Sequence, residues 1–120
     1  MSGINNNSGE EFHQRAIRGH QKTIVSTLEN HKRAFNAILD CLLQSDELPY
    51  NTHASLLIKE RDTPLELGNK VSDLLKHLYE PNSANAFRVF CESLDKEGLK
   101  ELRAAIREED VDGYAVVQQV

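Results

Sequence analysis

Apolar residues recur at helical spacing along most of the chain. From residue 11 onward, the apolar positions repeatedly fall at i, i+3, i+4 and i+7, which places their side chains on one face of an α-helix. The clearest stripe lies at Phe87, Phe90, Cys91 and Leu94, just before the charged turn 95–98. We place six short helices by this pattern, at residues 11–29, 32–45, 50–59, 64–78, 83–94 and 99–109. No alternation typical of β-strands appears.

Local signals mark several helix ends. In the segment 63–66, Thr63 is a capping residue, Pro64 suits the first helical position, and Glu66 completes a capping box. Ser83 or Asn82 is expected to cap the fifth helix. Gly19 lies inside the first helix and predicts a bend there. The third helix is the weakest assignment, because its apolar residues 56–58 are consecutive rather than spaced.

Short amphipathic helices joined by short turns predict one compact all-α bundle. A chain of 120 residues with 39% hydrophobic residues is long enough for one domain with its own core. We expect this domain to span residues 10–110. Residues 1–9 are small and polar and predict a disordered N-terminal tail, and residues 111–120 form a C-terminal extension.

The charge balance limits the classes of partner. The formal net charge is −5, which argues against attraction to nucleic acid or to anionic membranes. No apolar run has the length of a membrane span, and the N-terminus lacks the apolar core of a signal peptide. Cys41 and Cys91 lie in or beside apolar stripes and are expected to be buried, reduced thiols. A cytoplasmic location fits these features best.

No motif indicates catalysis, a cofactor or a metal. The sequence contains neither a nucleophile elbow nor a phosphate-binding or dinucleotide-binding glycine pattern. Five histidines (His13, His20, His31, His53 and His77) are scattered without partners at ligand spacing, so we expect them at the surface. The segment 108–113 lacks the ligands of a calcium loop. The Phe87/Phe90 stripe carries no polar group, which indicates core packing, and function is therefore sought on the outer surface.

Charges of opposite sign gather on different predicted helices. At 100° per residue, Arg15, Arg18 and Lys22 lie within about 60° of one another on the first helix, away from its apolar stripe. Acidic residues follow later, at Asp40, Asp46, Glu47, Glu60 and Asp62. A domain with separate basic and acidic faces can bind copies of itself or related domains head to tail. Such contacts produce open filaments when the rotation between copies does not close a ring.

Three segments, in order, resemble a caspase recruitment domain (CARD). AILDCLLQSDELP resembles the second helix and following turn of that family, and TPLELGNKVSDLLKHL is similar to its fourth helix. SANAFRVFCESLDKEGLKEL resembles the fifth helix and the start of the sixth, where the family often has Ala-Phe-x-x-Phe-x-x-x-Leu. The resemblance covers residues 11–109. It departs from the family in a fourth helix poor in arginine and in the turn 79–82, where the family more often has a basic-Gly turn.

The resemblance implies a six-helix antiparallel Greek-key bundle of the death fold with a kinked first helix. It also implies a module without activity of its own, which assembles apoptotic or inflammatory signalling complexes. The partner would be another CARD-containing protein, either a caspase or an adaptor, and self-assembly into filaments would be possible. The family's common contact carries over onto two sets of residues. The basic face would comprise Arg15, Arg18, Lys22 and Lys70, and the acidic face Asp40, Asp46, Glu47 and Glu60.

Other functions stay open at this point. Death effector and death domains share the bundle and rank second within the superfamily. A helical regulator that binds a peptide or amphipathic helix in an apolar groove is the competing class. Its candidate contact residues are Tyr50, Leu65, Val116 and Val117, and a contiguous apolar patch would favour it. An enzyme is the third alternative and has no motif in its support.

Overall fold

The computed structural model describes residues 11–106, and this part of the chain contains helices and turns but no β-strand. The all-α prediction is therefore confirmed. The helices are α2 (Phe12–Glu29), α3 (Lys32–Gln44), α4 (Tyr50–Leu56), α5 (Pro64–Leu78) and α6 (Ala84–Lys96), followed by a sixth helical segment at 100–106. The two predicted tails, the motif at 108–113 and the end of the last predicted helix lie outside the described residues.

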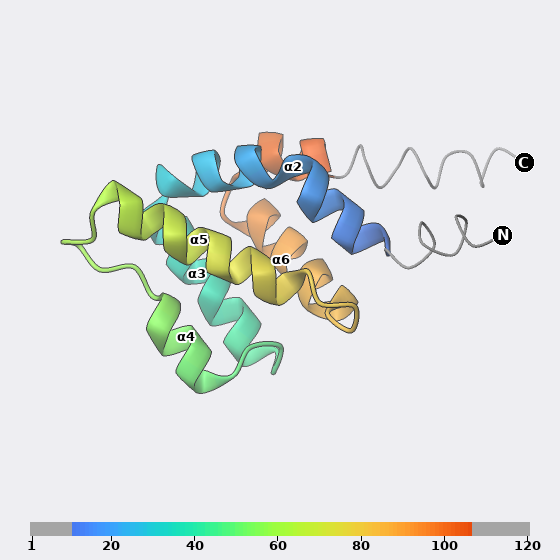
Figure 1. Ribbon diagram of the computed structural model, residues 1–120, viewed down its shortest axis with the longest axis horizontal. Coiled ribbons are helices and arrows are strands. Elements are labelled where there is room, and N and C mark those ends of the chain that lie inside the picture. The colour runs from blue at the N-terminus through green and yellow to red at the C-terminus, as the bar shows by residue number, and fades with distance from the viewer. Residues whose placement is uncertain (1–10, 107–120) are drawn as a thin grey trace, which may run out of the picture.

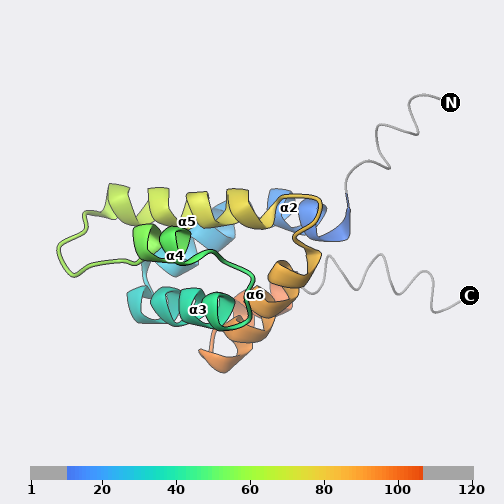
Figure 2. The same cartoon turned by 90° about the horizontal axis from the view of Figure 1, so that it is seen from below.

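The helices form two antiparallel pairs, α2 with α5 and α3 with α6 (Figures 1 and 2). At one end of the first pair, the Gln14 side chain donates from Nε2 to the Tyr79 carbonyl at 2.7 Å. At the other end, Glu29 lies so close to Gly68 that a Cβ there would be 2.6 Å from its carboxylate. Helix α4 packs against α3 and α5. Figure 1 also shows that α2 changes direction along its length.

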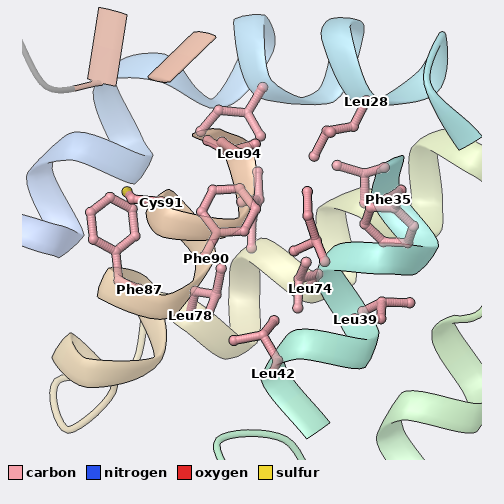
Figure 3. Close-up of a cluster of buried hydrophobic side chains, with 14 of the residues drawn as sticks. Leu28, Phe35, Leu39, Leu42, Leu74, Leu78, Phe87, Phe90, Cys91 and Leu94 are labelled. Carbon is pink, nitrogen blue, oxygen red and sulfur yellow. The ribbon is translucent and has the colours of Figure 1, made fainter. Parts of the chain in front are cut away.

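The apolar stripes of the helices meet in one core (Figure 3). Phe35 of α3, Leu74 of α5 and Phe90 of α6 are each 0% exposed. The Phe90 ring stacks against Phe87, with centroids 6.1 Å apart. The stripe around Phe90 therefore belongs to the core, as the sequence predicts.

Helix α4 is shorter than predicted, because the chain leaves the helix at Leu57. The backbone of Leu57 is extended, with φ −57° and ψ 131°. From this point the burial of the side chains alternates from one residue to the next, as in an extended chain: Leu56 and Ile58 are buried, while Leu57 is only partly buried. The Asn36 side chain of α3 fixes this segment by two hydrogen bonds. Its Nδ2 donates to the Ile58 carbonyl at 3.0 Å, and its Oδ1 accepts from the Ile58 N–H at 2.8 Å.

Asn36→Asp is expected to lower the free energy of unfolding by about 1–3 kcal/mol, because a carboxylate cannot donate to the Ile58 carbonyl and would repel it. Urea unfolding followed by circular dichroism measures the change. Asn51→Asp is the matched control, because Asn51 is exposed in the first turn of α4, where a negative charge is favourable. Equal losses in both variants would contradict a structural role for the Asn36 amide.

The capping box at the start of α5 is confirmed. The Glu66 N–H donates to Thr63 Oγ1 at 3.2 Å, the Thr63 N–H donates to Glu66 Oε1 at 2.7 Å, and Pro64 begins the helix. At α6 the prediction is half right. Ser83 occupies the N-cap position, but its hydroxyl donates to the His77 carbonyl at 3.1 Å instead of accepting from the helix. This bond ties the start of α6 to the last turn of α5.

Two helices end with the same backbone geometry, a Schellman motif. After α6, Gly98 has φ +80° and the Leu99 N–H donates to the Leu94 carbonyl at 2.9 Å. After α3, Asp46 has φ +60° and the Glu47 N–H donates to the Leu42 carbonyl at 2.9 Å. Glycine suits this left-handed conformation, whereas an aspartate adopts it at a cost. The α3–α4 turn therefore keeps an acidic side chain at a position that glycine would fit better.

Asp46→Gly is expected to raise the free energy of unfolding by about 0.5–1 kcal/mol, because it relieves the cost of a positive φ. The change is measured by urea unfolding. Ala37→Gly in the middle of the same helix is the control and should lower the stability by about 1 kcal/mol. A loss of stability in Asp46→Gly would show that the aspartate side chain stabilises the turn by more than the backbone strain costs.

Candidate partner-binding surfaces

Two segments of the folded chain carry charges of a single sign. Residues 12–28, which form most of α2, contain three Lys or Arg residues and no acidic residue. Residues 34–58, which include most of α3 and all of α4, contain three acidic residues and no Lys or Arg. Because α2 packs along α5 while α4 packs against α3, these two segments present different surfaces (Figure 1).

The basic surface consists of Arg15, Arg18 and Lys22 of α2 together with Lys76 of α5. Lys22 and Arg18 are exposed, and the half-buried Arg15 places its guanidinium 5.0 Å from the centre of the Phe12 ring. Lys76 joins the surface because it lines the same groove as Arg18 and its side chain is 80% exposed, although its Nζ also lies 3.9 Å from Asp73 Oδ1 on the preceding turn of α5. The sequence reasoning missed Lys76. The sequence feature that could have indicated Lys76 is its place in the last turn of the predicted fourth helix.

Lys70 was expected on the basic face but has partners within the chain. Its Nζ donates to Asp62 Oδ2 and to the Leu57 carbonyl, each at 2.7 Å. The side chains of Lys70 and Asp62 are only 20% and 9% exposed. This pair holds the loop between α4 and α5, and Asp62 of the same chain neutralises the Lys70 charge. Lys70 therefore does not belong to the basic surface.

The acidic surface consists of Asp40, Asp46 and Glu47, which lie on α3 and the turn that follows it. The Asp40 side chain is 57% exposed and accepts at 2.8 Å from Nε2 of His53, which is 8% exposed. Asp46 is exposed, whereas the half-buried Glu47 accepts a hydrogen bond from Asn85 of α6. Glu60 lies apart, in the loop at the opposite end of α4. Three of the four predicted acidic residues thus share one part of the molecule.

The Asp62–Lys70 pair makes stability depend on pH. The Lys70 ammonium, followed by the Lys59 N–H at 2.9 Å, holds the pKa of Asp62 below its ordinary value. A carboxyl whose pKa is lower in the folded state stabilises the fold above its unfolded pKa, about 3.9 for aspartate. This contribution is lost as the pH falls through the lower, folded pKa. Acid therefore weakens the α4–α5 loop.

Asp62→Asn is expected to lower the stability at pH 7 and to reduce the further loss of stability on acidification below about pH 4. The amide keeps an acceptor for the Lys59 N–H but no charge for Lys70. Urea unfolding at both pH values measures the two effects. An unchanged pH dependence in the variant would show that other carboxyl groups govern acid unfolding.

Two histidines expected at the surface are buried. His13 is 4% exposed and donates from Nε2 to the Glu80 carbonyl at 2.8 Å, and His53 is held by Asp40. Each ring has a polar partner that compensates for lost water, which is why an imidazole fits inside. Within residues 11–106, no group of three His, Cys, Asp or Glu side chains is arranged to hold a metal. Cys91 is buried as expected, but the Cys41 thiol is only half-buried.

The apolar residues expected to line a groove do not form one patch. Tyr50 and Leu65 are 71% and 73% exposed, as their sequence context suggests. Tyr50 begins α4, whereas Leu65 follows the loop at the other end of α4. Val116 and Val117 lie outside the described residues. The described surface therefore offers separated charges rather than a contiguous apolar groove built from these residues.

No helix in the described part of the chain combines the length and apolar character needed to cross a membrane. Comparisons of the chain with protein-family models, with curated proteins and with solved structures each found no match. The geometry of the charged surfaces is therefore the main evidence on function.

Proposed function

We propose that this chain is a CARD-like interaction module that binds another domain of its kind through its basic and acidic surfaces. The observation that carries the proposal is that residues 12–28 of α2 carry only basic charges, whereas residues 34–58, from α3 to the end of α4, carry only acidic ones. In this proposal the bundle is a death fold with Greek-key connections and a kinked first helix, acting in the cytoplasm in cell-death or inflammatory signalling. The sequence resemblance supports these details. A death effector or death domain is the alternative within the same superfamily.

The two surfaces allow head-to-tail association. The basic surface of one copy can face the acidic surface of the next, which leaves one unoccupied surface at each end of any open assembly, basic at one end and acidic at the other. Exposed charges contribute mainly to the rate and orientation of encounter, since water and salt weaken each individual pair. The Debye length falls from about 30 Å at 0.01 M salt to about 8 Å at 0.15 M. Association should therefore decrease steeply as salt is added.

Sedimentation velocity of the full chain over a range of NaCl concentrations tests the proposal. Self-association that weakens with salt is expected, and Asp46→Asn should weaken it further, because asparagine keeps the shape and tolerates the left-handed backbone but removes the charge. Glu101→Gln is the matched control, an exposed acid outside both surfaces. A chain that stays monomeric at low salt, or two variants with equal effects, would contradict this proposal.

A further inference from the structure

Tyr50 projects into solvent from a rigid site beside the acidic surface. It is the first residue of α4, and the turn before it contains Asp46 and Glu47. The turn is fixed by Leu48, which is 3% exposed, and by the Pro49 carbonyl, which accepts from the His53 N–H at 2.9 Å. An aromatic ring held on such a base loses little conformational freedom when a partner covers it.

A shallow groove runs between α2 and α5, within the basic surface. Its apolar lining comes from Ile17 and Leu75, each 2% exposed, and from the half-buried Tyr79. Its polar lining includes Arg18 and Lys76, with Gln21 and Glu80. The groove thus combines apolar side chains that can contact a ring with two cations that can face acidic neighbours of that ring, although Glu80 in the lining and Asp73 beside Lys76 offset part of the positive charge.

Tyr50 cannot fill the groove of its own chain in this fold. Figure 1 shows α5 lying between α2 and α4, and α4 contacts α3 and α5. The two features are nevertheless complementary, because a protruding ring can enter a groove and its acidic neighbours can face the cations of that groove. In a second copy of the chain, the groove is available to Tyr50 of the first copy.

We propose that Tyr50 of one copy inserts between α2 and α5 of a second copy, with Asp46 and Glu47 facing Arg18 and Lys76. This inference rests on the proposed function, since it uses the same two surfaces, and it adds a specific anchor to them. Charges set the encounter, whereas the buried ring prolongs the complex. Tyrosines packed in the centre of an interface commonly contribute most to affinity.

The test compares self-association of the full chain and its variants by sedimentation velocity at several NaCl concentrations. Tyr50→Ala should weaken association by about tenfold or more, with an unchanged salt dependence because no charge is removed. Leu65→Ala is the matched control, because Leu65 is equally exposed but outside both surfaces, and its effect should be less than about twofold. Tyr50→Phe should retain most of the affinity, because it keeps the ring.

A second variant tests the groove itself. Gln21 is exposed and lines the groove, so Gln21→Trp should fill it and weaken self-association without changing the charge. An equimolar mixture of Tyr50→Ala and Gln21→Trp should recover a one-to-one complex, because the first variant retains an open groove and the second retains the ring. Thermal unfolding checks that both variants fold. If Gln21→Trp does not fold, the effect of Tyr50→Ala alone decides whether the ring anchors the complex.

The outcomes separate this inference from the proposed function. Association that depends on salt but not on Tyr50 would overturn the inference and leave the charged surfaces standing. Association that depends on Tyr50 but not on salt would support the ring as an anchor, and it would overturn both the charge-based proposal and the facing of Asp46 and Glu47 with Arg18 and Lys76. A wild-type chain that stays monomeric at low salt would overturn both.

Discussion

Lys22→Glu is expected to abolish self-association of the chain and to leave its helical content and unfolding temperature unchanged. Lys22 is exposed on the basic surface, and the buried face of α2 lies elsewhere, at residues such as Ile17, Ile24 and Leu28. A glutamate there would face the acidic surface of the next copy, and like charges in such a contact cost several kcal/mol. Sedimentation velocity at low salt measures the loss.

Lys100→Glu is the matched control for this charge reversal. Lys100 is exposed at the start of the last helical segment, and each reversal changes the formal net charge by −2, from −5 to −7. The two variants therefore repel other copies equally at long range. If both lose association to the same extent, net charge rather than the basic surface controls assembly, and the assigned surface is wrong.

Phe90→Ala is expected to lower the free energy of unfolding by about 3–5 kcal/mol. The ring is 0% exposed and lies among side chains from several helices in Figure 3, so its removal leaves a cavity that the bundle cannot easily close. Since domains of this kind are stable by only about 5–15 kcal/mol, the variant should be close to unfolding. Urea unfolding measures the change.

Phe90→Leu serves as the conservative comparison, because it keeps most of the apolar volume and should cost much less. Tyr50→Ala serves as the second comparison, since it removes an aromatic ring that is 71% exposed and should leave stability within about 0.5 kcal/mol of the wild type. A loss below about 1 kcal/mol in Phe90→Ala would mean that the core does not depend on this ring as the structure indicates.

Features set by neighbours in the chain were predictable from the sequence, whereas features set by distant contacts were not. The start of α5 depends on Thr63 and Glu66, three residues apart, so the capping box could be recognised directly. The end of α4 depends on Asn36, whose side chain binds Ile58 from 22 positions away. No local sequence pattern predicts such a long-range hydrogen bond. The consecutive apolar residues 56–58 are equally compatible with a helix and with an extended segment.

The same distinction explains the candidate surfaces. From helical spacing and turn signals alone, Lys22 could be placed on the exposed face of its helix and Asp46 in an exposed turn. The partner of Lys70 could not, because Asp62 reaches it only when the α4–α5 loop folds back. His53 was expected in water for a similar reason, since its partner Asp40 lies on another helix.

The antiparallel pairing of α2 with α5 also bears on how the chain folds as it leaves the ribosome. Gln14 finds its acceptor only when Tyr79 has been made, and Tyr79 lies 65 positions further along the chain. Until then the apolar stripe of α2 lacks its main packing partner. A nascent chain that stops before α5 would expose this stripe and be prone to aggregation or chaperone capture. Native collapse of the bundle is therefore expected only after α5 has been synthesised.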